Sequence, residues 1–122
     1  MEQDILDLSF LHNLSGSDTA YIYDVITLFL EVVPPGILQL EQLIVEGNDF
    51  DAIHKQAHFL KSSAAIIKIK DVYEDLIRIV ALAREQRGIE EITLRMKNLT
   101  SNFNEAMPLI LAERERCQPA VS

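Results

Sequence analysis

The sequence predicts an all-α fold, an antiparallel up-down-up-down four-helix bundle with a short N-terminal helical arm. Apolar residues recur every three or four positions along most of the chain, and no segment shows the period of two that is typical of a strand. Gly and Pro are scarce, with 4 of each in 122 residues, which favours helices. Every link between the apolar stretches is short, so neighbouring helices are expected to run antiparallel.

The boundaries of the early elements follow from capping and helix-breaking residues. Ser17 or Asp18 is suited to cap the first bundle helix. Pro34 and Pro35 are expected to end that helix, because proline lacks a backbone donor, and Pro35 also suits the first turn of the next helix. The expected elements in chain order are an arm at 4–14 and helices at about 18–33, 35–46, 49–67, 70–86 and 89–114.

Glycine marks two later boundaries. Gly47 suits a left-handed helix cap, and Asn48 or Asp49 suits the start of the helix that follows. Gly88 separates the last two helices. Pro108 lies inside the last helix, where its ring obstructs the carbonyl four residues earlier, so a kink is expected there.

Length, composition and charge limit the class of protein. A chain of 122 residues that is 48% hydrophobic is expected to form one domain, at 1–116, followed by a flexible tail at 117–122. No apolar run approaches the roughly 20 residues that span a bilayer, so a soluble, cytoplasmic protein is expected. The net charge of −8 argues against nucleic acid or a membrane as a partner. Cys117, the only cysteine, is interpreted as an incidental thiol in a frayed tail.

One histidine stands out on the helix expected at 49–67. His58 lies roughly 130° from the centre of the apolar stripe, so its ring is expected to point outward. Lys61 and Ser62, three and four residues on, are its surface neighbours. An exposed imidazole beside a cation and a small side chain suits a nucleophile that carries a phosphoryl group. The stripe consists of Phe50, Ile53, Ala57, Leu60, Ala64 and Ile67.

The charge around His58 departs from that of the rest of the chain. The stretch from Ala52 to Lys70 contains four lysines and no acidic residue. An ordinary solvated helix face can have this composition, but its coincidence with the histidine favours a surface for an acidic partner. Phe59 and Ile66, on the side beyond Ser62, are expected either to pack against the arm or to form a partner patch. The lysines are Lys55, Lys61, Lys68 and Lys70.

The segment Ala57-His58-Phe59-Leu60-Lys61-Ser62-Ser63-Ala64-Ala65 closely resembles the signature of histidine phosphotransfer (HPt) domains. That signature reads Ala-His-x-Leu-Lys-Gly-Ser-Ser, with a second Gly ten residues after the His. The likeness covers almost the whole chain: the segment at 14–18 resembles the family's opening, the one at 47–50 its turn before the histidine helix, and Gly88 its last turn.

The resemblance implies a phosphocarrier without catalytic machinery of its own, in a two-component phosphorelay. His58 would accept a phosphoryl group from an aspartyl phosphate on a receiver domain and pass it to another receiver. Lys61 would neutralise charge, and Ser62 would be the small neighbour with a possible hydrogen bond. Response-regulator receivers and a hybrid sensor histidine kinase would be the partners of a monomer that binds no cofactor or metal; Mg²⁺ is expected on the receiver. The expected docking residues are His54, Lys55, Phe59, Ala65 and Ile66.

Two residues depart from the signature. Ser62 replaces the first Gly, and it is small enough to admit a receiver and can donate a hydrogen bond. Lys68 replaces the second Gly about 15 Å along the helix from His58. It is expected to alter the join into the next helix or the rim of the docking surface. Val80 stands where the family often has a polar residue near the histidine, so that contact is not carried over.

Three other interpretations of the sequence compete with a phosphocarrier. His54, His58 and Asp51 have a spacing that can bind zinc, although no third ligand is clear. A helical interaction module could dock a response regulator or kinase without being phosphorylated, and the departure at Lys68 leaves room for it. An independent enzyme is disfavoured, because the sequence has no nucleotide loop, no nucleophile–base set and no convincing carboxylate pair. The tyrosines Tyr21, Tyr23 and Tyr73 are interpreted as bundle aromatics.

Overall fold

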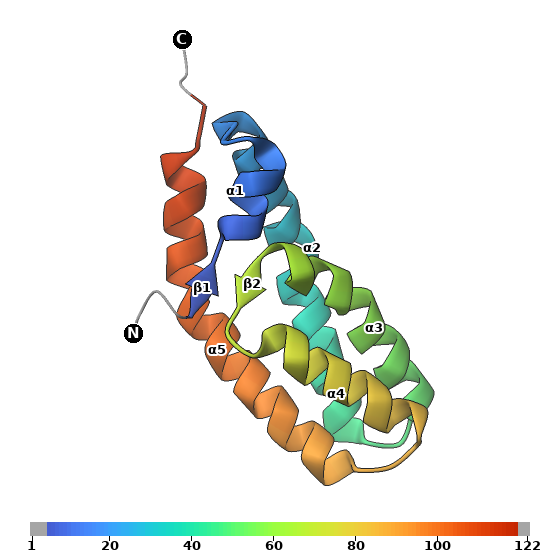
Figure 1. Ribbon diagram of the computed structural model, residues 1–122. Coiled ribbons are helices and arrows are strands. Elements are labelled where there is room, and N and C mark those ends of the chain that lie inside the picture. Colours follow the sequence, from blue (N-terminus) through green and yellow to red (C-terminus); the bar gives the residue numbers. More distant parts are fainter. Residues whose placement is uncertain (1–4, 120–122) are drawn as a thin grey trace.

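The computed structural model describes residues 5–119, which form an all-α bundle with one very short antiparallel sheet (Figure 1). The predicted fold class is confirmed. In chain order the elements are β1 (Leu6–Asp7), α1 (Ser9–Ser15), α2 (Thr19–Glu46), α3 (Phe50–Ile66), β2 (Lys68–Ile69), α4 (Val72–Arg84) and α5 (Ile89–Arg116).

The four long helices pack in a closed ring. Helix α2 contacts α3 and α5, and α4 contacts the same two helices from the other side. Successive helices run in opposite directions along the bundle, while α1 lies against the N-terminal part of α2 (Figure 1). Apolar side chains from all five helices form one buried cluster between them. Burial of this cluster holds the four helices at fixed positions, and α3 and α4 carry the candidate site.

Helix α2 continues through Pro34 and Pro35, so the expected break between 18–33 and 35–46 is absent. A proline inside a helix costs about 3 kcal/mol, and packing of the inward face offsets that cost here. Gly36 lets α3 approach closely, since a Cβ there would lie 2.8 Å from Leu60 Cδ2. The Gln56 side chain also donates a hydrogen bond of 2.9 Å to the Gly36 carbonyl. The helix is therefore held across the prolines by its contact with α3.

The continuous α2 is long and apolar enough, by length and composition alone, to cross a membrane. One face of this helix supplies eight buried residues to the bundle. Packing in the core accounts for the apolar character of this buried face.

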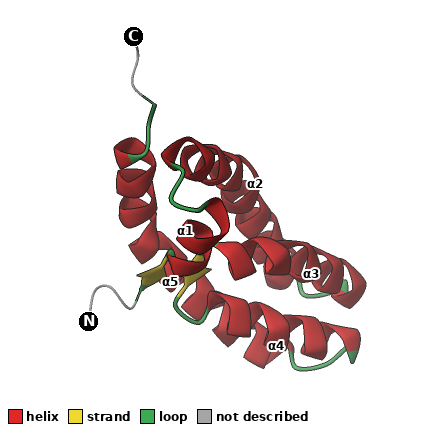
Figure 2. Ribbon diagram, turned by 45° about the horizontal axis from the view of Figure 1, so that its top comes forward, coloured by secondary structure: helices red, strands yellow, loops and turns green. Residues whose placement is uncertain are grey.

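Strands β1 and β2 were not expected. They pair antiparallel, with Leu6 opposite Ile69 and Asp7 opposite Lys68. The Lys70 N–H adds a hydrogen bond of 2.9 Å to the Ile5 carbonyl. The sheet (yellow in Figure 2) connects the N-terminal segment to the link between α3 and α4. Lys68 therefore lies where β1, α3 and α4 meet.

The C-terminal part of the chain differs from expectation at its end. Helix α5 contains Pro108, and its red C-terminal part runs in a different direction from its orange part (Figure 1). Cys117 is 1% exposed, so this residue belongs to the core and not to a frayed tail. Residues 120–122 of the expected tail, and residue 4 of the expected arm, lie outside the described residues.

Candidate functional site

The outer face of α3 carries the candidate site. Asp49 caps this helix by accepting a hydrogen bond of 3.0 Å from the Ala52 N–H. The inward side chains are buried against the neighbouring helices, and His58 on the opposite side is exposed, as its angular position predicted. The buried side chains of α3 are Ile53, Ala57, Leu60 and Ala64.

A shallow hollow surrounds the imidazole of His58. Within residues 5–119 the side chains of His58 and Lys61 take part in no hydrogen bond or ion pair. The Ser62 hydroxyl donates only a long bond of 3.4 Å to the Phe59 carbonyl of its own helix. The ring and the ammonium group are thus both open to a ligand, and the serine hydroxyl is weakly engaged. The hollow is lined by His58, Phe59, Lys61, Ser62 and Ala65 of α3 and by Tyr73 of α4.

His54 lies beside this hollow, one turn before His58. The two imidazole rings are nearly parallel, at 5°, with centroids 6.1 Å apart. The His54 Nε2 atom is buried and has no hydrogen-bond partner in the described part of the chain. His54 therefore flanks His58 without making a polar contact to it.

The residues of the zinc interpretation do not form a cluster. Asp51, its carboxylate, makes an ion pair of 2.9 Å with Lys55. That contact raises the pKa of Lys55, and Lys55 does not line the hollow. Over residues 5–119 no group of three His, Cys, Asp or Glu side chains is placed to hold a metal ion.

A second groove opens beside the hollow, between α3 and α2. Phe59 and Ile66 line this groove together with side chains of α2, and no residue of the arm is among its lining residues. Phe59 is 55% exposed and Leu28 on α2 is 60% exposed. Large apolar side chains left open at the edge of a groove are typical of a protein interaction surface. Residues lining this α2–α3 groove include Val25, Leu28, Val32, Phe59, Ser62 and Ile66.

The sequence did not predict Tyr73 as a site residue. It was interpreted as a bundle aromatic, but it lies in the first turn of α4 and lines the hollow. The sequence contained a weak signal that Tyr73 points away from the core. Val72 in the same turn is buried, and Tyr73, one residue later, lies about 100° further round the helix. Val80 is 6% exposed and contributes to the core, as its apolar character suggests.

Comparison with known families identifies the class of protein. The chain matches the family model of the Hpt domain over residues 24–105, which is more than half of its length. It therefore belongs to the Hpt domain family. Hpt domains in general are phosphocarriers of two-component phosphorelays and interact with receiver domains and histidine kinases. No curated protein and no solved structure matched the chain.

Proposed function

We propose that this chain accepts a phosphoryl group on His58 from the aspartyl phosphate of a receiver domain and passes it to another receiver. The observation that carries the proposal is the open imidazole of His58 beside the Lys61 ammonium group, on a face that a second protein can reach. The hybrid sensor histidine kinase that supplies the relay is part of the same proposal.

The chemistry needs little from this chain beyond position and charge. A neutral ring nitrogen of His58 attacks phosphorus with its lone pair. A phosphorus–nitrogen bond forms while the bond to the aspartate oxygen breaks, and the aspartate leaves with that electron pair as a carboxylate. The proton on the other ring nitrogen can pass to solvent. Lys61 offsets negative charge on the transferred oxygens, and the receiver is expected to supply Mg²⁺.

The apolar surface beside His58 supports docking of a whole domain. A stable interface covers about 800 Å² on each partner, which is more than the hollow alone provides. The α2–α3 groove extends the surface from Phe59 to Leu28. We therefore place the receiver over the hollow and this groove, in contact with Phe59, Ala65 and Ile66. His54 flanks that surface, and Lys55 lies at its edge.

The test is transfer from phosphorylated receiver domains to His58→Gln. The wild-type chain is expected to gain an acid-labile, base-stable label, which is typical of a phosphorus–nitrogen bond. His58→Gln is expected to fold normally, by circular dichroism, and to gain no label. His12→Gln is the matched control, because His12 lies outside the hollow, and it is expected to be labelled.

Labelling of His58→Gln at the wild-type level would refute the assignment. Receiver binding by the wild-type chain, with no labelling by any receiver or kinase tested, would instead support the helical interaction module.

A further inference from the structure

A third groove lies on the side of the hollow that faces α1. It is continuous with the hollow, because Ala65 and Tyr73 line both. An exposed surface therefore extends from His58 past Tyr73 to Phe10 on α1. The residues lining this α1–α4 groove are Phe10, Ala64, Ala65, Lys68, Ile69, Tyr73 and Glu74.

Lys68 supplies the cation of this groove. Its Nζ atom lies 5.8 Å from the centroid of the Phe10 ring, which is within the range of a cation–π contact. Asp7 lies opposite Lys68 in the sheet, but its Oδ1 atom accepts a hydrogen bond of 2.9 Å from the Ser9 N–H at the start of α1. The side chain of Lys68 remains exposed.

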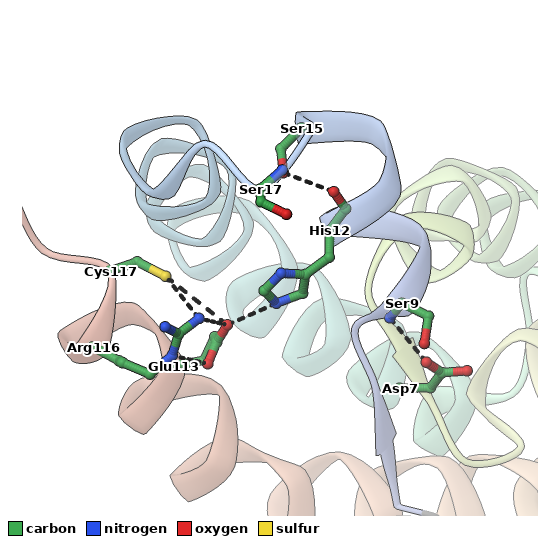
Figure 3. Close-up of polar contacts among 8 residues, drawn as sticks. All are labelled: Asp7, Ser9, His12, Ser15, Ser17, Glu113, Arg116 and Cys117. Carbon is green, nitrogen blue, oxygen red and sulfur yellow. Dashed lines mark hydrogen bonds and ion pairs between the residues drawn. The ribbon is translucent and has the colours of Figure 1, made fainter.

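Contacts at both ends of α1, drawn in Figure 3, hold the helix that carries Phe10. The bond between Asp7 and Ser9 holds the beginning of the helix. Near its end, His12 Nε2 lies 2.9 Å from Glu113 Oε2 on α5. Arg116 holds the same carboxylate at 2.7 Å. A helix held in this way loses little conformational freedom when a partner binds.

We propose that the α1–α4 groove is a second, selective part of the receiver-docking surface, where Lys68 pairs with an acidic side chain on the rim of the receiver. The proposal rests on the proposed function. A patch of about 800 Å² has a radius of ~16 Å. Helix α3 ends at Ile66, about 12 Å along the helix from His58, and Lys68 follows two residues later, so it falls near the edge of a patch centred on His58. Charges at the rim of an interface govern association rate and partner choice.

The charge distribution favours an acidic partner at this position. No acidic residue occurs between Ala52 and Lys70, although the chain has a net charge of −8. Glu74 is the one carboxylate that lines the groove. Lys68 and Glu74 balance each other's charge in the groove, so exchanging the lysine for glutamate leaves the groove with negative charges only.

The experiment compares Lys68→Glu with Lys97→Glu, a matched charge change at an exposed position of α5. Transfer is measured as kcat/KM from the purified phosphorylated receiver that labels the wild-type chain fastest. Lys68→Glu is expected to lower kcat/KM by about three- to tenfold at low salt. The loss is expected to shrink in 0.5 M salt, because exposed charges are screened. Phe10→Ala is expected to lower kcat/KM without this salt dependence.

A small phosphodonor separates docking from chemistry. Phosphoramidate can transfer its phosphoryl group from its own nitrogen to an imidazole, with release of ammonia, and it needs no docking surface. Labelling of His58 by phosphoramidate is expected to be equal in the wild type, Lys68→Glu, Phe10→Ala and Lys97→Glu.

Two results would overturn the proposal, and they differ. If Lys68→Glu and Phe10→Ala transfer as fast as Lys97→Glu, the docking proposal is wrong and the proposed function stands. If phosphoramidate labels His58 and no receiver does, the proposed function is wrong and the docking proposal fails with it.

Discussion

The polar side chains around His58 on α3 differ from those at the interface between α4 and α5 in whether they have hydrogen-bond partners. Asp75 on α4 is 1% exposed, and its carboxylate accepts hydrogen bonds from Asn98 at 2.8 Å and from Arg95 at 3.3 Å. On α3, the side chains of His58 and Lys61 have no polar partner among residues 5–119. The first set of polar groups is satisfied within the chain, and the second is available to another molecule.

The difference has an energetic reason. A buried carboxylate without donors would cost several kcal/mol, so Asp75 requires its partners for folding. An exposed imidazole or ammonium group keeps its water and costs the fold nothing. The outer face of α3 can therefore be altered with little effect on stability, while the α4–α5 interface cannot.

The largest effect on stability is expected from Asn98→Ala. Loss of this donor leaves the buried Asp75 carboxylate with Arg95 alone, which should lower the free energy of unfolding by about 1–3 kcal/mol. Burial raises the pKa of Asp75, and the Asn98 hydrogen bond opposes that rise by favouring the ionised form. The loss should therefore be larger at pH 7 than near pH 4, where more of the carboxyl is protonated.

Urea denaturation measures this change, and Asn104→Ala, at an exposed position of α5, is the matched control. Equal stability of the two variants would contradict the role of the α4–α5 contacts. A change in phosphoramidate labelling of His58 in folded Asn98→Ala would show that the two regions are not independent.

Lys61→Ala tests the open face of α3. Loss of the ammonium group removes charge neutralisation next to the phosphoryl group, so transfer from a receiver should slow by about tenfold. Stability should change by less than about 0.5 kcal/mol, because the side chain has no partner in the described residues. Lys97→Ala is the control, since Lys97 is exposed on α5 and does not line the hollow. An unchanged transfer rate would remove Lys61 from the mechanism.

The features that depend on local spacing were predictable from the sequence. Helices α3, α4 and α5 begin and end within two residues of the expected ranges, and the helical angle alone placed His58 on the outside. Apolar periodicity and capping residues determine both, so no knowledge of the neighbouring helices was needed.

The features that depend on contacts between distant segments were not predictable. Helix α2 passes through Pro34 and Pro35 because its packing against α3 offsets the local cost, which no local pattern records. Strands of two residues have no period to detect. Tyr73 and Phe10 join the surface around His58 only because α4 and α1 pack beside α3. Lys68 is the exception, since its departure from the HPt signature marked it as a residue of interest at the join.

The smallest expected effect concerns His12, a partly exposed histidine that contrasts with His58 because it has a partner. Arg116, and to a lesser extent His12, hold the pKa of Glu113 below its ordinary value of 4.5. The stabilisation from Glu113 is therefore fully present above pH 4.5 and is lost as the pH falls through the lowered pKa. Glu113→Gln should lower the free energy of unfolding by about 1 kcal/mol at pH 7, and the difference from wild type should vanish at low pH. Glu115→Gln, at an exposed position of the same helix, should show no such difference. A loss that stays constant between pH 7 and pH 3 would mean that Glu113 acts by packing and not by charge, and the contrast between a paired and an open histidine would lose its electrostatic basis.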